Sequence, residues 1–325
     1  MTIATTITIL AISFLISVIL APILIPILRR LKFGQSIREE GPKSHMKKAG
    51  TPTMGGIIFL ISIIATTVIV GNLYNVFTTQ TVVLLLVLCG FGLIGFLDDG
   101  IKVIFKRNLG LTSLQKLVGQ IIISVLAFLL LRQGTFDTTV TVPFVEWSIN
   151  LGIFYVGFLI FWLVGFSNAV NLTDGLDGLV AGTASIAFTA FGVIALFNNQ
   201  VDVAIFTFAI TGALLGFLLF NANPAKVFMG DTGSLALGGA LALVSILVNQ
   251  ELLLLIIGIV FVIETLSVIL QVAYFKLTGG KRIFKMTPIH HHFELSGWSE
   301  RKIVLVFWFT ALIVALIGVL SEAIV

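Results

Sequence analysis

NANPAKVFMGDTGS, residues 221–234, is a short polar stretch between two long apolar runs, 201–220 and 233–249. Because about 20 apolar residues cross the hydrocarbon of a bilayer, this stretch is expected at a membrane boundary. Asp231 follows a glycine and lies near the first turn of the next helix, where free backbone N–H groups favour anions. A carboxylate in this position can hold a divalent cation, which in turn holds phosphate oxygens. The alternative is that Asp231 or Thr232 simply caps a transmembrane helix.

The composition of the whole chain is typical of an integral membrane protein. Of its 325 residues, 58% are hydrophobic and 10% are charged, and the mean hydropathy is +1.14. We therefore predict an all-α polytopic membrane protein with a single catalytic domain, residues 1–325. No basic segment precedes the first apolar run, which we interpret as a retained helix rather than a signal peptide. The single cysteine, Cys89, lies in an apolar run and forms no disulfide framework.

The apolar runs predict about ten transmembrane helices. Their expected bounds are 4–28, 53–71, 79–97, 114–131, 151–169, 177–197, 201–220, 233–249, 252–276 and 302–323. The longest outer connection, 132–150, contains the alternating pattern TFDTTVTVPFVEW, which predicts a small extracytoplasmic β-hairpin. The segment GFGLIG, residues 90–95, matches a dinucleotide-binding pattern but lies within a membrane helix. We interpret its glycines as sites of close helix packing.

The basic residues predict the orientation. If both termini lie outside, eighteen of the nineteen lysines and arginines lie in or beside cytoplasmic loops, and only Arg132 lies outside. This surplus suits anionic lipid and phosphate-bearing partners at the cytoplasmic face of the membrane. No nucleic acid partner is expected, because the chain has no soluble basic domain.

Two further motifs place carboxylates at the same face. FLDDG, residues 96–100, ends the third predicted span with adjacent Asp98 and Asp99, whose mutual repulsion suits a base or a shared cation. A solvated helix end is the alternative. SNAVNLTDGLDG, residues 167–178, gathers amides and carboxylates among glycines that let backbone approach a ligand. Here the alternative is ordinary turn chemistry.

The first and last inner loops carry basic motifs. KSHMKKAGTPTMGG, residues 43–56, contains lysines and threonines able to bind phosphate, although juxtamembrane lysines are also plain topology signals. KMTPIHHHFELSGWSE, residues 285–300, is expected to be extended, so that His290 and His292 share one side and His291 faces away. With no cysteine nearby, binding of a base or phosphate is favoured over a structural zinc. Glu264 and Gln271, within the ninth predicted span, are expected to face protein rather than lipid.

These motifs together resemble the phospho-N-acetylmuramoyl-pentapeptide transferases, of the polyprenyl-phosphate N-acetylhexosamine-1-phosphate transferase superfamily. The resemblance covers the ten-span plan, GTPTMGG, FLDDG, NLTDGLDGL, NANPAKVFMGDTGS and PIHHHFE. It implies transfer of phospho-MurNAc-pentapeptide from its UDP carrier to undecaprenyl phosphate in the bacterial plasma membrane. The products are lipid I and UMP, and Mg²⁺ is the implied cofactor. A homodimer is also implied.

The resemblance also implies roles for particular residues. Asp231 becomes the metal ligand, Asp98 and Asp99 lie where the lipid phosphate is activated, and His290 is a further catalytic residue. The residues implied near the nucleotide are Asn171, Asp174, Asp177, Asn221 and Phe228. Those implied near the sugar diphosphate are Lys48, Thr53, Gln271, His291 and His292, with Lys102 and Lys116 as further phosphate-binding residues.

Three rival functions remain open from the sequence. A related transferase would use UDP-GlcNAc, although the triple histidine of PIHHHFE favours the muramoyl substrate. An intramembrane prenyltransferase typically carries two Asp-x-x-x-Asp sites, whereas this chain has an adjacent pair and Asp174-x-x-Asp177. A transporter would place polar residues deep within broken helices, whereas here they gather at one face.

Overall fold

The computed structural model describes residues 1–31, 50–105, 109–134, 136–145 and 147–324. Among them, ten helices are long and apolar enough to cross a membrane, which confirms the predicted all-α polytopic fold. The helices are α1 (Ile3–Arg30), α2 (Gly56–Leu73), α3 (Thr79–Ile104), α4 (Ser113–Leu131), α5 (Tyr155–Thr173), α6 (Leu179–Phe197), α7 (Val201–Asn221), α8 (Gly230–Leu247), α9 (Leu254–Ile257), α10 (Ile259–Leu277), α11 (Ile289–Glu294) and α12 (Glu300–Ile324).

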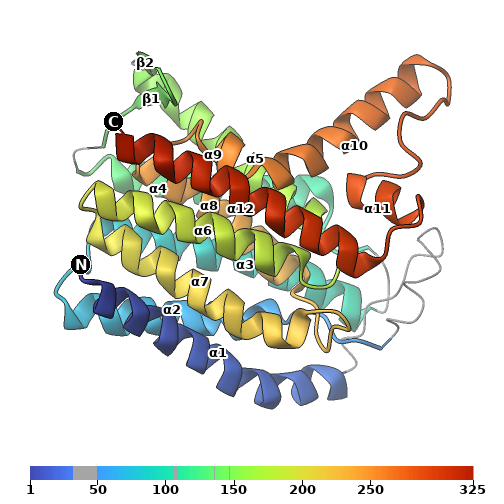
Figure 1. Ribbon diagram of the computed structural model, residues 1–325, viewed down its shortest axis with the longest axis horizontal. Helices are drawn as coiled ribbons and strands as arrows, with labels where there is room; N and C mark the ends of the chain where they lie inside the picture. Colours follow the sequence, from blue (N-terminus) through green and yellow to red (C-terminus); the bar gives the residue numbers. More distant parts are fainter. Residues whose placement is uncertain (32–49, 106–108, 135, 146, 325) are drawn as a thin grey trace.

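Helix α8 forms the centre of the bundle. Every residue from Thr232 to Leu247 is buried, and α3 and α5 make the most extensive contacts with this helix. Its small residues allow this packing: a Cβ added to Gly238 would lie 2.3 Å from the carbonyl oxygen of Phe166 in α5. Helices α7, α6, α1 and α12 form the neighbouring part of the bundle (Figure 1). The start of α8, which carries Asp231, is therefore held on several sides.

The third transmembrane helix is longer than we predicted. We expected it to stop at residue 97, before the charged FLDDG motif, but α3 continues to Ile104. The continuation is possible because Asp98 and Lys102 are four residues apart on one helix face and form an ion pair. The carboxylates therefore lie within a helix and not at its end.

The ninth predicted span is interrupted. Short α9 ends at Ile257, Gly258 separates it from α10, and α10 leans away from the rest of the bundle (Figure 1). The buried residues of α10 are Val260, Phe261, Glu264, Ser267 and Gln271. Their spacing forms one helix stripe. The expectation that Glu264 and Gln271 face protein is confirmed.

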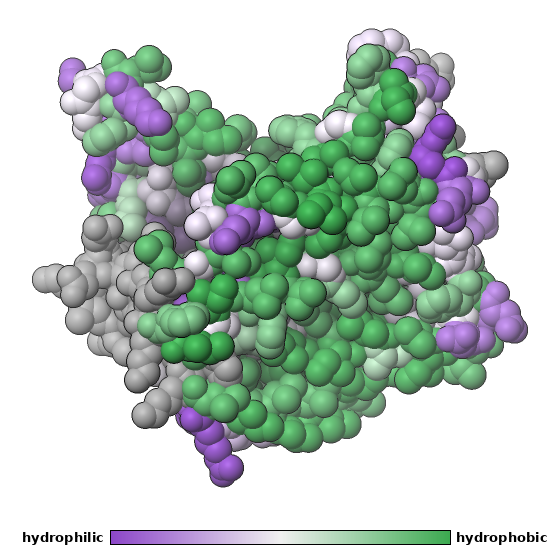
Figure 2. All heavy atoms as spheres, turned by 180° about the vertical axis from the view of Figure 1, so that it is seen from behind, coloured by the Kyte–Doolittle hydropathy of each residue, from purple (hydrophilic) through white to green (hydrophobic). Residues whose placement is uncertain are grey.

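The predicted hairpin is present. β1 (Thr139–Val142) pairs with antiparallel β2 (Trp147–Asn150), with Thr139 opposite Asn150. A short 3-10 helix, η2 (Gly152–Phe154), follows and leads into α5. The hairpin and both chain termini lie at the same end of the bundle (Figure 1). Between the two ends, the face seen in Figure 2 is broadly apolar, as lipid contact requires.

Candidate functional site

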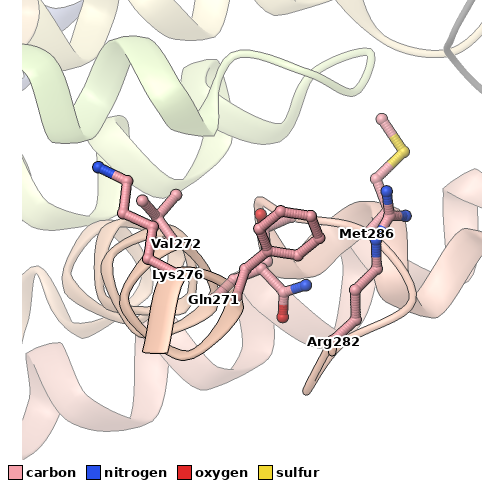
Figure 3. Close-up of a pocket in the computed structure, with 7 residues that line it drawn as sticks. Gln271, Val272, Lys276, Arg282 and Met286 are labelled. Carbon is pink, nitrogen blue, oxygen red and sulfur yellow. The ribbon is translucent and has the colours of Figure 1, made fainter. Parts of the chain in front are cut away.

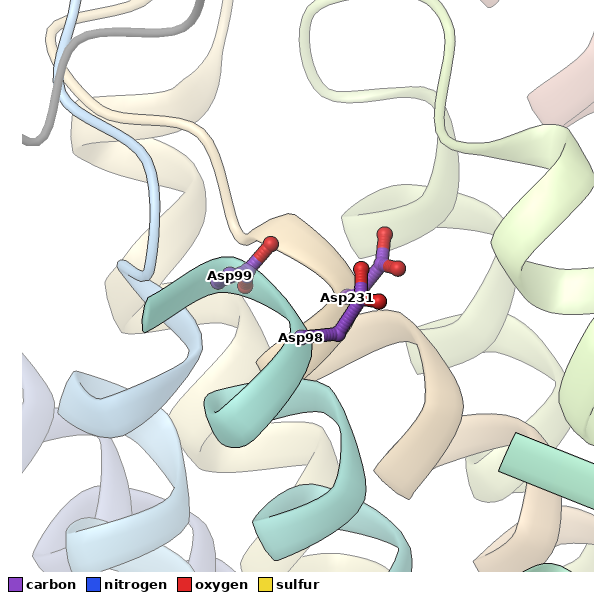
Figure 4. A group of neighbouring side chains, drawn as sticks. All are labelled: Asp98, Asp99 and Asp231. Carbon is purple, nitrogen blue, oxygen red and sulfur yellow. The ribbon is translucent and has the colours of Figure 1, made fainter. Parts of the chain in front are cut away.

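The site is built where α3 crosses the start of α8. A Cβ added to Gly95 would lie 2.1 Å from the carbonyl oxygen of Asp231, so only glycine allows the two backbones to come this close. One turn further along α3, Asp98 and Asp99 are brought beside Asp231 (Figure 4). The interpretation of GFGLIG as a close-packing segment is confirmed at Gly95.

Three carboxylates lie together at this crossing. One oxygen from each of Asp98, Asp99 and Asp231 lies within 4.8 Å of the others. Asp98 and Asp99 are 0% and 4% exposed, so the alternative of a solvated helix end is wrong for this pair. Burial of like charges this close is costly unless cations compensate for it.

Two lysines supply that compensation. Lys116 Nζ lies 2.7 Å from Asp231 Oδ2 and 3.0 Å from Asp98 Oδ2. Lys102 Nζ contacts Asp98 Oδ2 and lies 3.2 Å from Asp231 Oδ2. Both lysines therefore bridge α3 to α8. Lys116 is placed by the start of α4, where the Thr112 side chain accepts from the backbone N–H of Gln115 at 3.2 Å.

The carboxylate orientations are fixed by hydrogen bonds. Asp99 Oδ2 accepts from the backbone N–H of Thr232 at 3.0 Å and from its hydroxyl at 2.8 Å. Asp231 Oδ1 accepts from Asn171 Nδ2 at 2.9 Å, and the same amide lies 2.8 Å from Ser234 Oγ. The end of α5 is thereby tied to the first turn of α8.

Thr53 lies against the same turn. Gly230 has φ +70°, and a Cβ there would lie 2.5 Å from Asp99 Oδ2 and 2.6 Å from Thr53 Oγ1. The backbone N–H of Phe228 donates to Pro52 at 2.8 Å, and Gly55 donates back to Phe228 at 2.8 Å. These bonds fix the segment before α2 beside the segment before α8.

Asp177 and Asn221 take part in a network on another side of the loops. Asp177 Oδ2 accepts from Asn223 Nδ2 at 3.2 Å and from the Ala225 backbone at 3.0 Å. Asn221 donates to the carbonyl of Val227 at 3.0 Å and accepts from Gly178 N–H at 3.1 Å. Both side chains are buried, 4% and 3% exposed. The network joins the α5–α6 loop to the α7–α8 loop. Asp174, at the end of α5, is half-buried.

The three histidines belong to a short helix, which corrects the expected extended segment. Residues 289–294 form α11, so successive side chains turn by about 100° instead of alternating. His290 is 1% exposed, whereas His291 and His292 are partly exposed. His291 Nδ1 lies 2.8 Å from Glu294 Oε2, and His292 Nδ1 accepts from the Lys285 backbone at 3.1 Å.

Gln271 lines an open pocket of about 260 Å³ between α10 and the segment leading to α11 (Figure 3). The side-chain oxygen Oε1 of Gln271 accepts hydrogen bonds from the backbone N–H groups of Ile283 and Phe284, at 3.0 and 2.9 Å. Lys276 and Arg282 lie on the same pocket. Among the candidates, Lys48 lies outside the residues that the structure describes.

Comparison with known proteins decides the family. Residues 81–249 match Glycosyl transferase family 4, and residues 48–60 match the phospho-N-acetylmuramoyl-pentapeptide-transferase signature 1. The chain is 63% identical over 312 residues to a phospho-N-acetylmuramoyl-pentapeptide-transferase of Geobacillus thermodenitrificans, covering 96% of each chain. Proteins of the same name from Listeria monocytogenes and Halalkalibacterium halodurans are each 61% identical, over 95% and 96% of both chains. The chain belongs to the phospho-N-acetylmuramoyl-pentapeptide-transferase family.

For this member of the transferase family, the structure brings six of the candidates into direct contact. They are Asp98, Asp99, Lys102, Lys116, Asn171 and Asp231. Carboxylate oxygens are the ligands that Mg²⁺ prefers, and the two lysine side chains beside them are partly exposed, at 32% and 23%. The donor set therefore fits a magnesium ion.

The sequence reasoning missed several residues that support this transferase site. Thr232 and Ser234 stand inside the quoted polar stretch, but Thr232 was considered only as a helix-capping residue and Ser234 was given no role. Glu300 accepts from the Asp177 backbone at 2.7 Å and from Asn223 at 3.0 Å, across 123 and 77 residues of sequence. The only feature of the sequence that could have pointed to Glu300 was its position as a charged residue at the start of the last span.

Proposed function

We propose that this chain transfers phospho-MurNAc-pentapeptide from its UDP carrier to undecaprenyl phosphate, giving lipid I and releasing UMP. The observation that carries the proposal is the placement of Lys102 and Lys116 among three facing carboxylates, in a chain of this family. Transfer between two anions needs charge neutralisation and alignment more than covalent help. A cluster with movable cations at the membrane boundary supplies both.

We propose Mg²⁺ as the cofactor, held by Asp231 with the neighbouring carboxylates. A bound magnesium ion would offset the charge of the diphosphate and polarise its oxygens. Asn171 keeps Asp231 Oδ1 oriented, and Thr232 holds Asp99. Lys102 and Lys116, displaced from Asp231, then pair with phosphate oxygens. Asp231→Asn should abolish magnesium-dependent turnover in a protein that remains folded, and near-normal activity at low magnesium concentration would contradict the assignment.

We propose direct attack by the lipid phosphate. Its oxygen attacks the β-phosphorus, and the bond from that phosphorus to the bridging oxygen breaks as UMP leaves. Asp98 Oδ1 accepts from the Leu111 backbone N–H at 2.7 Å, and Oδ2 contacts Lys102 and Lys116. Once these lysines pair with phosphate oxygens instead, Oδ2 is the atom that would accept any proton remaining on the attacking phosphate. Asp99 positions this step through its bonds to the first turn of α8.

We propose that the protein lies in the bacterial plasma membrane with the carboxylate site at the cytoplasmic face and both termini outside. The basic asymmetry of the sequence supports this orientation. With Cys89 replaced by serine, single cysteines at positions 47, 106 and 285 should react only with reagents that reach the cytoplasm. Labelling of any of them from outside intact cells would refute the orientation.

We further propose a homodimer, as the family resemblance implies. Light scattering of the protein in detergent, corrected for bound detergent, should give twice the chain mass of 35.1 kDa. A monomeric mass at all protein concentrations would contradict it.

The decisive experiment compares sugar nucleotides. Purified protein with undecaprenyl phosphate and Mg²⁺ should release UMP from UDP-MurNAc-pentapeptide and not from UDP-GlcNAc. Release only from UDP-GlcNAc would assign the chain to the related GlcNAc-1-phosphate transferases instead. Release from neither would overturn the proposed function.

A further inference from the structure

A buried carboxylate–imidazole pair lies outside the aspartate cluster. Glu264 on α10 is 0% exposed and His290 on α11 is 1% exposed. Glu264 Oε1 lies 3.1 Å from His290 Nδ1. Among the described residues, neither oxygen of Glu264 and neither ring nitrogen of His290 makes a hydrogen bond, so the 3.1 Å approach of Oε1 to Nδ1 is the polar contact that each side chain has. A buried carboxylate is costly without a partner, so this pairing decides how both side chains are held.

The other edge of the imidazole touches the acidic loop between α5 and α6. A Cβ added to Gly175 would lie 2.2 Å from His290 Nε2 and 2.8 Å from its Cε1. Gly175 follows Asp174 directly, and its backbone N–H bonds to Thr173 at 2.8 Å. His290 therefore fills the space between α10 and this loop, and the contact requires glycine at position 175.

Two positions on α10 hold the segment that carries the histidines. Gln271 binds the backbone N–H groups of Ile283 and Phe284, and Glu264, about two turns earlier, faces His290. α11 also packs through Phe293, whose ring stacks on Trp298 at a centroid distance of 5.0 Å. The segment is consequently fixed to α10, and through His290 it is fixed against the acidic loop.

We propose that Glu264 is a positioning residue that acts through His290 to fix the loop at Asp174 and Gly175. Because a carboxylate only accepts hydrogen bonds, it holds the imidazole proton on Nδ1 and leaves Nε2 bare against the Cα of Gly175. The inference rests on the proposed function and on the place near the nucleotide that the family resemblance implies for Asp174. It gives His290 a positioning role in place of the catalytic role that the resemblance implied.

Kinetics of Glu264→Gln separate these roles. The amide has the same size, but its NH₂ group can donate to Nδ1 and so move the ring proton to Nε2. We expect the KM for UDP-MurNAc-pentapeptide to rise about tenfold, the lower end of the effect known for residues that orient metal ligands through a hydrogen bond. The kcat should change less than threefold, and the KM for undecaprenyl phosphate should not change. Glu264→Asp, which keeps the carboxylate, should recover part of the loss.

Two results would overturn the proposal. A fall in kcat of a hundredfold or more with unchanged KM would make His290 a catalytic acid or base. A lower thermal midpoint with both KM values unchanged would make the pair merely structural. Thr265→Val is the matched control, because within the described parts of the chain the Thr265 hydroxyl bonds only to the Phe261 carbonyl, at 2.9 Å and inside α10.

Two measurements do not depend on turnover. The chain has four histidines, so ¹⁵N-histidine spectra can be assigned with His290→Asn, and they should show an Nδ1-protonated ring that changes tautomer in Glu264→Gln. Gly175→Ala should lower the thermal midpoint of the otherwise wild-type protein in detergent, and should not lower it further in a His290→Ala background. An unchanged tautomer, or a further fall of the midpoint in that background, would refute the positioning contact. If the wild type released no UMP, the proposed function would fail while these two results still tested the contact.

Discussion

Thr232 and Asp99 are joined by two hydrogen bonds to one atom. The backbone N–H of Thr232 lies 3.0 Å and its hydroxyl 2.8 Å from Oδ2 of Asp99. The first turn of α8 thus provides its free N–H group and a side chain to a carboxylate of α3. The pairing leaves Asp99 Oδ1 facing Lys102, 4.0 Å away. One face of the site is therefore set by the start of a helix and not by a loop.

Thr232→Val should weaken the site without changing its shape. Hydrogen bonds to charged groups contribute about 1.5–3 kcal/mol, so loss of the hydroxyl should lower the free energy of unfolding by about that amount. If the same free energy is lost from the transition state, turnover should fall by about one to two powers of ten, because each step of about 1.36 kcal/mol is tenfold in rate. Thr232→Ser should behave like the wild type. Thr183→Val, which removes a buried hydroxyl bonded within α6, is the control. Equal UMP release by Thr232→Val and the wild type would contradict this role.

Gly95→Ala should disrupt the crossing of α3 and α8. The added methyl would lie 2.1 Å from the carbonyl oxygen of Asp231 and 2.5 Å from the Thr232 nitrogen, both backbone atoms. Overpacking of this kind costs about 1–3 kcal/mol. We expect a lower thermal midpoint in detergent and loss of UMP release. Gly100→Ala on the same helix meets no atom within 4 Å and should not lower the midpoint. Similar behaviour of the two variants would refute the close-packing role of Gly95.

The number of spans and the hairpin could be predicted from the sequence because each depends on a local pattern. Long apolar runs define the spans, and alternation defines the strands Thr139–Val142 and Trp147–Asn150. The end of α3 could not be predicted in the same way. Charges at Asp98 and Asp99 were interpreted as the limit of the membrane helix, whereas Lys116, from another helix, compensates for Asp98 in the interior.

The composition of the site was predictable, but its internal arrangement was not. Asp98, Asp99 and Asp231 were expected to act together, and they do lie together. The hydrogen bonds of the Asn221 amide to Val227 and Gly178 could not be predicted, whereas its expected place near the nucleotide stays a prediction. The hydrogen-bond partners of a side chain such as that of Asn221 depend on how the loops pack against one another. The spacing of residues in the sequence does not predict that packing. The helical conformation of residues 289–294 was missed for a similar reason, because its contacts with Glu264 of α10 and Phe307 of α12 are tertiary.

The stability of the protein should depend on the ionisation of Glu251. This carboxyl is 0% exposed in the turn between α8 and α9, and its Oε1 accepts from the Tyr155 hydroxyl. Burial raises the pKa of Glu251 from its ordinary value of 4.5 to about 7, although the Tyr155 bond lowers it. The folded state therefore favours the protonated form. Its contribution to stability, on the order of 3 kcal/mol, is complete below pH 4.5 and is lost as the pH rises through 7.

The measurement is the thermal midpoint in detergent between pH 4.5 and 8. The wild type should lose stability over this range relative to Glu251→Gln, whose amide does not ionise. Tyr155→Phe should extend the loss to higher pH, since it removes the bond that favours the charged carboxylate. Parallel curves for the wild type and Glu251→Gln would show that the carboxyl does not titrate in this window.

The order of substrate binding and UMP release should distinguish direct attack from a covalent intermediate. A phosphate monoester has a second pKa of about 6 and is already anionic near neutral pH, so the lipid phosphate needs little more than a base and a cation. Direct attack at the β-phosphorus then requires both substrates before UMP can leave. A covalent aspartyl intermediate would instead release UMP before lipid binds, and it would exchange free UMP into the sugar nucleotide.

Exchange of labelled UMP distinguishes the two routes. Rigorously delipidated protein is incubated with UDP-MurNAc-pentapeptide, Mg²⁺ and radiolabelled UMP, and the sugar nucleotide is then isolated and counted. Direct attack predicts no label in it until undecaprenyl phosphate is restored. Lys102 and Lys116 cannot produce exchange alone, because they neutralise the phosphates without forming a bond to phosphorus. Exchange at a rate comparable to turnover in the lipid-free sample, lost in Asp98→Asn, would establish the covalent route and exclude direct attack.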